Sequence, residues 1–388
     1  MRAPLRDATA IVGIGQSAFA KQLPGSELSL GLTAAMAALD DAGITPDEVD
    51  GLASYTMERD IEVEVARSLG LGNVGWWAQV GYGGGAGCGV VGQAAMAVVT
   101  GQANVVLAWR ARKRGSAASR PWAQVGDRIP GAPQWTRPVG LLRPVDEIAM
   151  LTRRYMHEYG ATRDHLANVA LAARAHANRN PVATMYERKL TREDYLAARW
   201  ISEPLCLFDN CLETDGAVAA VIVSAERARD LRQQPAYIHA FGQGLNAQHQ
   251  TMTNYFRDDP LEGPGWACAE VLWRGAAVGP DDVDVAQLYD AFSPLVPLSL
   301  EAYGFCKRGE GGPFTDDGAI ELGGRLPVNT SGAGMSEAYV HGFNLIAEAV
   351  RQVRGTSTAQ VPDAKVSLVT SGEGVPTSAL LMVKEPIQ

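Results

Sequence analysis

One order of segments occurs twice in this chain. The stretch AAMAALDDAGITPDEVDGLASY at residues 34–55 returns as ACAEVLWRGAAVGPDDVDVAQLYD at residues 267–290. A Gly-rich turn and an apolar run follow the early copy at residues 83–101 and the late copy at residues 330–355. The recurrence predicts two copies of one α/β unit packed together, with paired turns that can build a site between them.

Buried apolar runs place the expected elements of each half. In the first half the pattern predicts strands at 8–15, 49–55, 103–110 and 215–224, and helices at 28–42 and 88–100. In the second half it predicts strands at 236–242, 285–289, 365–370 and 378–384, and a helix at 295–303. We therefore expect halves at 1–230 and 231–388. Charged amphipathic helices and Trp, Pro and Gly-rich stretches at 113–204, with one helix at 163–177, predict an insertion in the first half that covers substrate or binds a cofactor.

Composition excludes several classes of protein. The 388 residues carry a formal net charge of −9, so the chain lacks the positive charge by which nucleic acid is bound, and the basic cluster at 110–114 is short. That cluster could still meet an anionic cofactor. No apolar run reaches the roughly 18 residues of a membrane span, and the first residues do not read as a secretion signal. We expect a cytoplasmic protein without membrane or nucleic-acid partners.

The cysteines and histidines give no metal signature. There are six histidines without ligand spacing and five cysteines without a CxxC pair: Cys88, Cys206, Cys211, Cys268 and Cys306. An odd number of unpaired cysteines argues against a disulfide framework and a zinc cluster. We expect no metal.

Two glycine patterns imitate a dinucleotide fingerprint. The first, at residues 13–18, follows a predicted strand, but Pro24 and Gly25 interrupt the helix that should receive the pyrophosphate. The second, at residues 87–92, lies inside a predicted helix, where close packing explains the glycines. Neither pattern predicts a nucleotide cofactor.

Four side chains near the repeated turns are candidates for chemistry. Cys88 is either a nucleophile at a helix N-terminus or a buried structural thiol, and His341 in the matching turn is either its base or a packing residue. Tyr289 ends a second-half strand and Tyr339 follows the turn TSGAG, so both are predicted at the rim of the site. From the residues alone, either tyrosine is catalytic or simply packs.

The order of these segments resembles the thiolase superfamily over essentially the whole chain. The resemblance rests on DDAGITPDEVDGL, GQANVVLA, DGAVAAVIVS, the DAF turn and LPVNTSGAGMSEA. The stretch LYDAFSPLVPLSLEAYGF and NTSGAG followed by SEA look like the lipid-transfer-protein branch, the sterol-carrier thiolase-like proteins. The resemblance implies an α/β thiolase fold: two duplicated βαβαβαββ halves in a five-layer αβαβα arrangement, with a loop-domain insertion in the first half.

The family's catalytic positions carry other residues here. The nucleophilic cysteine aligns at about Gly84, with Cys88 one turn later, and the last cysteine aligns near Ser371. The histidine of the Gly-His-Pro triplet falls on Tyr339, and the Asn or His that begins the DAF-like turn falls on Tyr289. Claisen condensation through a thioester intermediate is therefore not expected.

The substitutions resemble the actinobacterial thiolase-like aldolases of steroid side-chain degradation. The resemblance implies a retro-aldol lyase that splits a β-hydroxyacyl-CoA, a 17-hydroxy steroid C22-CoA, into a 17-ketosteroid and propionyl-CoA without a covalent intermediate. Tyr289 and Tyr339 would share the roles of base and enolate donor, in an order that the sequence leaves open. Supporting positions are expected at Asp290, His341, Gly334 and Gly372. Coenzyme A is part of the substrate, and no further cofactor is implied.

The resemblance also implies partners. Family members work with a protein that carries a DUF35 OB-type domain, and they form two-fold dimers. We expect the dimer to pair the strand after the Gly-rich helix, at residues 105–109.

Two other functions stay open on the sequence. A lipid or acyl-CoA binding or transfer protein would also lack the catalytic thiol. A thiolase-like acyltransferase would use Cys88 as its nucleophile.

Overall fold

The central element is one mixed sheet built from both halves of the chain. The computed structural model describes residues 4–59, 61–114, 131, 133–248, 250, 252, 254–255 and 257–387. In the described part of the chain the nine strands follow the order β3 (Trp76–Val80), β2 (Gly51–Tyr55), β4 (Val105–Arg112), β7 (Gly216–Ser224), β1 (Thr9–Gln16), β8 (Ala236–Gly244), β11 (Thr377–Val383), β10 (Val366–Ser371), β9 (Val285–Gln287).

The strand order repeats the duplication seen in the sequence. Strands β1, β7, β4 and β2 lie side by side in the first half, and β8, β11, β10 and β9 lie in the matching order in the second. Antiparallel pairing joins β1 to β7 and β8 to β11, and parallel pairing joins β2 to β4 and β9 to β10. The antiparallel pair β1–β8, with Ala10 opposite Tyr237, joins the halves. The predicted repeat is therefore a structural duplication.

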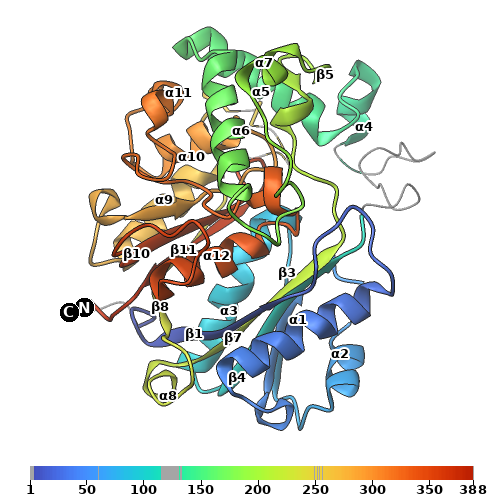
Figure 1. Cartoon of the computed structure of the whole chain (residues 1–388), viewed down its shortest axis with the longest axis vertical. Helices are drawn as coiled ribbons and strands as arrows, with labels where there is room; N and C mark the ends of the chain where they lie inside the picture. Colours follow the sequence, from blue (N-terminus) through green and yellow to red (C-terminus); the bar gives the residue numbers. More distant parts are fainter. Residues whose placement is uncertain are drawn as a thin grey trace.

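Helices pack against both faces of this sheet, and helices and strands together make five layers (Figure 1). Helix α1 (Glu27–Ala42) packs on β1, β7 and β4, and α9 (Pro264–Gly275) packs on β8 and β11. Helices α3 (Gly87–Val99) and α12 (Phe343–Arg354) contact each other and strands of both halves, so they form the middle layer. The small residues of α3 make this possible, since a Cβ on Gly92 would lie 2.3 Å from the Phe241 ring.

Local signals set the ends of the helices. The Ser26 hydroxyl accepts the backbone N–H of Ser29 at the start of α1, and Gly43, in the left-handed region at φ 73°, ends the helix. The other helices are α2 (Glu62–Leu69), α4 (Pro133–Thr136), α5 (Pro144–Tyr159), α6 (Arg163–Ala177), α7 (Arg192–Ala197), α8 (Ala225–Ala228), α10 (Leu295–Ala302) and α11 (Gly311–Phe314).

The insertion lies over one end of the core (Figure 1). It carries α4 to α7 and the two-stranded ribbon β5 (Trp200–Ser202) and β6 (Leu205–Cys206). Helix α6 has the predicted bounds and contacts the π-helical turn Ala333–Glu337, and the Tyr155 hydroxyl of α5 donates to the Glu301 carboxylate of α10. The insertion is thus packed against the second half. Part of the predicted range 113–204, namely 115–130 and residue 132, lies outside the described residues.

Two features of the sheet differ from the sequence-based expectation. Strand β3 and helix α2 were not predicted, and β3 forms one edge of the sheet. The expectation that the strand at 105–109 pairs with a second chain in the dimer is wrong. These residues lie in β4, which pairs with β2 along one edge and with β7 along the other. A strand with two neighbours has no free edge to offer a second chain.

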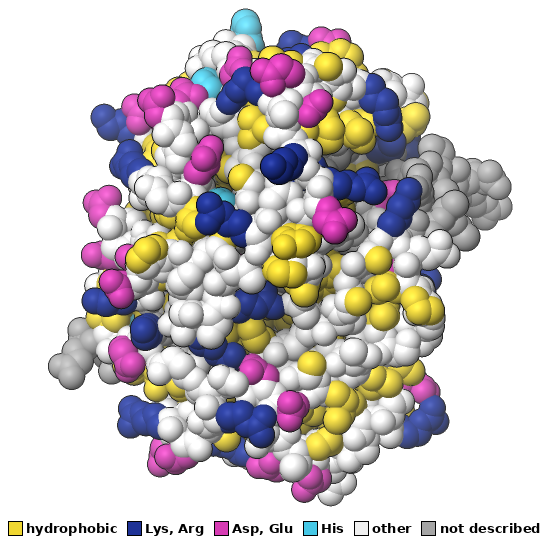
Figure 2. Space-filling model, viewed as in Figure 1, with side chains coloured by type: hydrophobic (Ala, Val, Ile, Leu, Met, Phe, Trp, Pro, Cys, Tyr) yellow, Lys and Arg dark blue, Asp and Glu magenta, His cyan; other side chains and the backbone are white. Residues whose placement is uncertain are grey.

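The surface agrees with the composition. In Figure 2, Lys and Arg side chains are interspersed with Asp and Glu over the face shown. Among the described helices, none has the length and apolarity that crossing a membrane requires. The described residues also contain no group of three or more His, Cys, Asp and Glu side chains that would hold a metal ion.

Candidate active site

Two tyrosine hydroxyls meet at the centre of the duplicated fold. Tyr289 follows β9, and Tyr339 lies in the segment between the π-helical turn Ala333–Glu337 and α12. Their Oη atoms are 2.5 Å apart, and the ring centroids are 6.3 Å apart with an interplanar angle of 52°. Tyr289 is 5% exposed and Tyr339 is partly buried. The structure therefore brings together the two residues that the sequence singled out.

Two threonine hydroxyls fix the backbone of the pair. The Tyr289 N–H donates to Thr370 Oγ1 on β10 at 3.0 Å, and the Tyr339 N–H donates to Thr214 Oγ1 at 2.9 Å. Both threonines are about 1% exposed. Buried hydrogen bonds of this kind are costly to break, so each tyrosine is anchored to a threonine from a different half of the chain.

The Gly-rich turn before α3 packs directly against Tyr289. A Cβ built on Gly84 would lie 1.9 Å from the Tyr289 Oη. Tyr82 and Gly83 precede it in the left-handed region, at φ 71° and 50°. A side chain at position 84 and the hydroxyl of Tyr289 therefore exclude each other, at the place where the nucleophilic cysteine was aligned.

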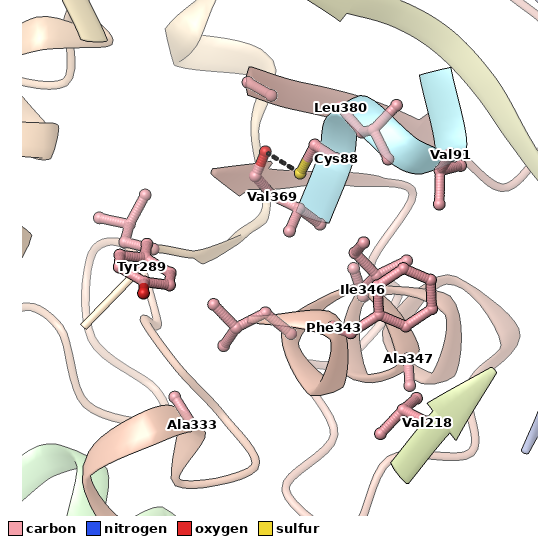
Figure 3. Close-up of a cluster of buried hydrophobic side chains, with 14 of the residues drawn as sticks. Cys88, Val91, Val218, Tyr289, Ala333, Phe343, Ile346, Ala347, Val369 and Leu380 are labelled. Atoms are coloured by element: carbon pink, nitrogen blue, oxygen red, sulfur yellow. Dashed lines mark hydrogen bonds between the residues drawn. The ribbon is translucent and has the colours of Figure 1, made fainter. Parts of the chain in front are cut away.

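Cys88 lies in the hydrophobic core. Figure 3 shows its thiol directed at the Val369 carbonyl, with a distance of 3.5 Å, in the cluster that contains Leu380. Burial raises the pKa of Cys88 to about 12. Its backbone N–H donates to Ser371 Oγ at 2.8 Å, so Ser371 holds the start of α3. A buried thiol of this kind is a poor nucleophile, which argues against the acyltransferase reading.

Asp290 holds the turn that leads to Tyr339. Its carboxylate accepts the N–H groups of Gly334 at 2.8 Å and Met335 at 3.0 Å. Burial raises the pKa of Asp290 to about 7. A Cβ on Gly334 would lie 2.7 Å from the Asp290 Oδ1, so only glycine permits this contact. The geometry gives Asp290 and Gly334 a role in shaping the site.

Gly372 brings the C-terminal turn against the first Gly-rich turn. It has φ 56°, and a Cβ there would lie 2.8 Å from the Gly85 Cα. A cavity of about 370 Å³ opens beside this contact and is lined in part by Tyr82, Gly85, Leu245 and Pro376. The paired turns of the two halves thus meet face to face.

His341 packs against Tyr339 on the side of β4. The two ring centroids are 5.3 Å apart and the rings are nearly perpendicular, at 79°. His341 Nδ1 lies 2.8 Å from Arg110 Nη2, and Arg110 Nη1 lies 2.5 Å from Glu58 Oε1. Burial and the positive charge of nearby arginines lower the pKa of His341 well below its ordinary value.

The sequence missed Arg110 and Glu58 as parts of this site. The signal was the alternation of arginines at 110, 112 and 114, which places the first two on one face of β4 and the third just beyond its end. On the sequence this cluster could meet an anionic cofactor. In the structure Arg110 pairs with Glu58, and Arg112 lies 3.7 Å from Glu27.

Both tyrosines of the pair are neutral phenols in this environment. Burial raises the pKa of Tyr289 well above its usual range. Burial also raises the pKa of Tyr339, whereas the Arg114 guanidinium and the hydrogen bond from Tyr289 oppose that shift. When the pair gives up one proton, the negative charge that remains is favoured on Tyr339.

Comparison with known proteins places this geometry in a family. The family model "Thiolase C-terminal domain-like" matches residues 247–385. The chain is 47% identical to the steroid side-chain-cleaving aldolase of Thermomonospora curvata, over 97% of this chain and 98% of that protein. It is also 47% identical to the 17-hydroxy-3-oxo-4-pregnene-20-carboxyl-CoA lyase of Mycobacterium tuberculosis, over 96% and 98% of the two chains.

A solved structure gives the same result. The aldolase titled Ltp2-ChsH2(DUF35) superposes with a TM-score of 0.92 at 47% identity, over 98% of each chain. Human mitochondrial 3-ketoacyl-CoA thiolase, at 14% identity and a TM-score of 0.70, shares the fold over 98% of this chain and 99% of its own. The chain therefore belongs to the thiolase superfamily and, within it, to the family of these carbon–carbon lyases. The predicted fold class and family are confirmed.

Proposed function

We propose that this protein is a retro-aldol lyase that cleaves a 17-hydroxy steroid C22-CoA into a 17-ketosteroid and propionyl-CoA. The full-length relatives at 47% identity, a steroid side-chain-cleaving aldolase and a 17-hydroxy-3-oxo-4-pregnene-20-carboxyl-CoA lyase, support the reaction class and the substrate. The observation that carries the mechanism is the 2.5 Å contact between the hydroxyls of Tyr289 and Tyr339. Coenzyme A enters as part of the substrate, and the reaction needs no other cofactor.

The reaction requires one proton acceptor and one proton donor. A base removes the proton of the 17-hydroxyl, the bond between C17 and C20 breaks, and its electron pair passes into the thioester as an enolate. Protonation of C20 then releases propionyl-CoA, while C17 becomes the ketone carbon. In our proposal one tyrosine accepts the hydroxyl proton, and the other, with backbone N–H groups of a Gly-rich turn, holds the enolate oxygen.

The contact between the Tyr289 and Tyr339 hydroxyls explains how a phenol could act as the base. A phenol with a raised pKa carries almost no anion at neutral pH. Because Tyr289 and Tyr339 are hydrogen-bonded, one can accept the substrate proton as it passes its own to the other, and the other gives its proton to C20 of the enolate, so that both phenols end neutral. The Arg114 charge, which opposes the rise in the pKa of Tyr339, favours Tyr339 as the oxygen that carries negative charge while the proton moves.

Phenylalanine substitutions test the assignment. We expect Tyr289→Phe and Tyr339→Phe each to lower kcat for release of propionyl-CoA by at least about 100-fold, the usual size of an acid–base contribution. Tyr186→Phe, at an exposed tyrosine of the insertion, is the matched control and should cleave at the wild-type rate. Wild-type cleavage by both variants of the pair would refute the proposal.

The same assay separates the lipid-binding alternative. The protein and an OB-domain partner are mixed with a β-hydroxyacyl-CoA, and short-chain acyl-CoA release is followed by chromatography. A binding or transfer protein would retain the thioester intact. Release that is lost in Tyr339→Phe would exclude this alternative.

We also propose two partners. The structural relative at 47% identity is titled as an aldolase of Ltp2 with ChsH2(DUF35), which supports a DUF35 OB-type partner for this chain. The edge strand β3, where Trp77 is 65% exposed, is the candidate for pairing in a homodimer. Light scattering should give a dimer mass that falls to the monomer in Trp77→Lys, and co-purification with the DUF35 protein should give a larger assembly.

A further inference from the structure

A buried chain of polar side chains runs behind Tyr339. Glu58 Oε1 lies 2.5 Å from Arg110 Nη1, and both side chains are fully buried. Arg110 Nη2 lies 2.8 Å from His341 Nδ1, and the guanidinium carbon is 4.5 Å from the centre of the Tyr55 ring. One planar cation is thus held on three sides by a carboxylate, an imidazole and an aromatic face.

Arg110 determines the state of His341. A guanidinium has only donors, so His341 Nδ1 accepts the hydrogen bond and the imidazole carries its proton on Nε2. The backbone of His341 is in the left-handed region at φ 50°, which a residue with a Cβ adopts only when its surroundings hold it there. The Tyr55 hydroxyl donates to the His341 carbonyl at 3.3 Å and supplies one of those contacts.

The imidazole of His341 holds the Tyr339 ring in place through a direct contact. The His341 ring stands edge to face with the Tyr339 ring at 5.3 Å, and the Tyr339 hydroxyl contacts Tyr289 at 2.5 Å. Tyr339 is therefore enclosed between the imidazole on one side and Tyr289 on the other. A shift of His341 would move the Tyr339 oxygen away from its partner.

We infer that Arg110 is a positioning residue of the cleavage reaction, which holds His341 as a neutral imidazole against Tyr339 and so keeps the two tyrosine hydroxyls in contact. The inference rests on the proposed function. It gives His341 a supporting role rather than that of a proton relay, because a neutral imidazole that already accepts from a guanidinium has no basic nitrogen to offer. Glu58 in turn orients the guanidinium.

The charges around His341 come from several elements. The groups that face it are Arg110, Arg112 and Arg114 from β4 and its end, Tyr55 from β2, Glu58 through Arg110, and Tyr339 from its own segment. The arginines all lower the pKa of His341, so removing one of these cations raises it.

Substitution of Arg110 gives the kinetic test. Arg110→Gln should lower kcat by about 10- to 100-fold with KM within about threefold of wild type, since loss of geometry acts on the chemical step. Arg110→Lys keeps the positive charge but not the planar, two-pronged guanidinium, and its kcat should fall between those of wild type and Arg110→Gln. Arg112→Gln removes the same charge from the same strand face without removing a hydrogen bond to His341 and is the matched control; its kcat should fall less than that of Arg110→Gln.

A double variant allows for loss of folding. Removing Arg110 leaves a buried carboxyl, although burial raises the pKa of Glu58 to about 7, so that this group can take up a proton. Glu58→Gln/Arg110→Gln removes both charges and should show the same loss of kcat. If the folded double variant, or folded Arg110→Gln, keeps kcat within twofold of wild type, the inference is wrong.

The state of His341 is read by NMR without any turnover. In wild type the ring signals should not titrate between about pH 5 and 8 and should report the Nε2–H tautomer. In Arg110→Gln the pKa of His341 should rise, because one of the cations that lower it is removed. A charged His341 in wild type at pH 7 would overturn the inference. A wild-type protein that shows the neutral tautomer but does not cleave the steroid thioester would refute the proposed function alone.

Substitution of His341 separates support from proton transfer. His341→Gln retains an acceptor for Arg110 and should keep kcat within about tenfold, whereas His341→Ala should lose about 100-fold. Equal loss in both variants would assign the imidazole to proton transfer and contradict the inference.

Discussion

The hydroxyl of Tyr289 occupies the space in which a side chain at position 84 would begin. The calculated separation of 1.9 Å between a Cβ on Gly84 and the Tyr289 Oη is far below any van der Waals contact. A side chain on the first Gly-rich turn at position 84 and the phenol of Tyr289 after β9 therefore exclude each other, because neither leaves room for the other.

Gly84→Ala and Gly84→Cys should both disable cleavage. Either side chain displaces the Tyr289 ring, and overpacking of this kind costs about 1–3 kcal/mol of folding free energy. We expect kcat to fall at least about 100-fold, because the hydroxyl pair is broken. Gly279→Ala, at a glycine whose added Cβ would meet no atom within 4 Å, is the control. Full activity in Gly84→Cys would show that Tyr289 need not stay where the structure places it.

The fold followed closely from the sequence where apolar runs are long. The apolar runs predicted α1 and β7, and the amphipathic pattern of the insertion predicted α6, each within a residue or two of its bounds. Strand β3 was missed because its five residues, WWAQV, alternate between partly buried and exposed positions at the sheet edge and follow the short charged helix α2. The late helix starts only at Phe343, since Asp290 draws the preceding residues into a π-helical turn.

The candidate site was predicted less completely. Tyr289 and Tyr339 emerged because they fall on positions where the resembled family carries other catalytic residues. Arg110 and Glu58 did not, since a contact between residues 110 and 341 depends on how β4 and the late turn are placed in space. Spacing along the chain carries no information about such a contact.

Cys88→Ala should leave cleavage unchanged. With a pKa of about 12, the thiol is ionised in only about one molecule in 10⁵ at pH 7. We expect kcat within twofold of wild type, and no acyl adduct in the intact mass of wild type after incubation with an acyl-CoA. An adduct that disappears in Cys88→Ala would instead establish the acyltransferase reading.

The two threonines that anchor the tyrosines should affect kcat more than KM. Thr214→Val and Thr370→Val preserve shape but leave a buried N–H of Tyr339 or Tyr289 without its acceptor, at a cost of about 1–3 kcal/mol. We expect kcat to fall about tenfold and to recover in the serine variants, which restore the hydroxyl. Thr152→Val, which removes a buried hydroxyl bonded to the Ile148 carbonyl in α5, should lower stability without this effect on kcat. Similar kcat values for all three valine variants would contradict the anchoring role.

The folding free energy should depend on Glu373. Its carboxyl packs at the start of α9, where a Cβ on Gly263 would lie 2.1 Å from Oε1, and burial raises its pKa from 4.5 to about 8. The folded protein therefore holds a proton that the unfolded chain releases between about pH 4.5 and 8. The stability contributed by this group is complete below pH 4.5 and is lost as the pH rises through 8.

Glu373→Gln should remove this part of the pH dependence. The neutral amide resembles the protonated carboxyl, so denaturant unfolding should give similar free energies at pH 5 and a gain on the order of 1–3 kcal/mol over wild type at pH 9. Glu270→Gln, at a surface ion pair with Arg274, should leave the slope unchanged. A wild-type slope in Glu373→Gln would mean that Glu373 is already ionised in the folded protein at neutral pH, with its charge stabilised at the start of α9.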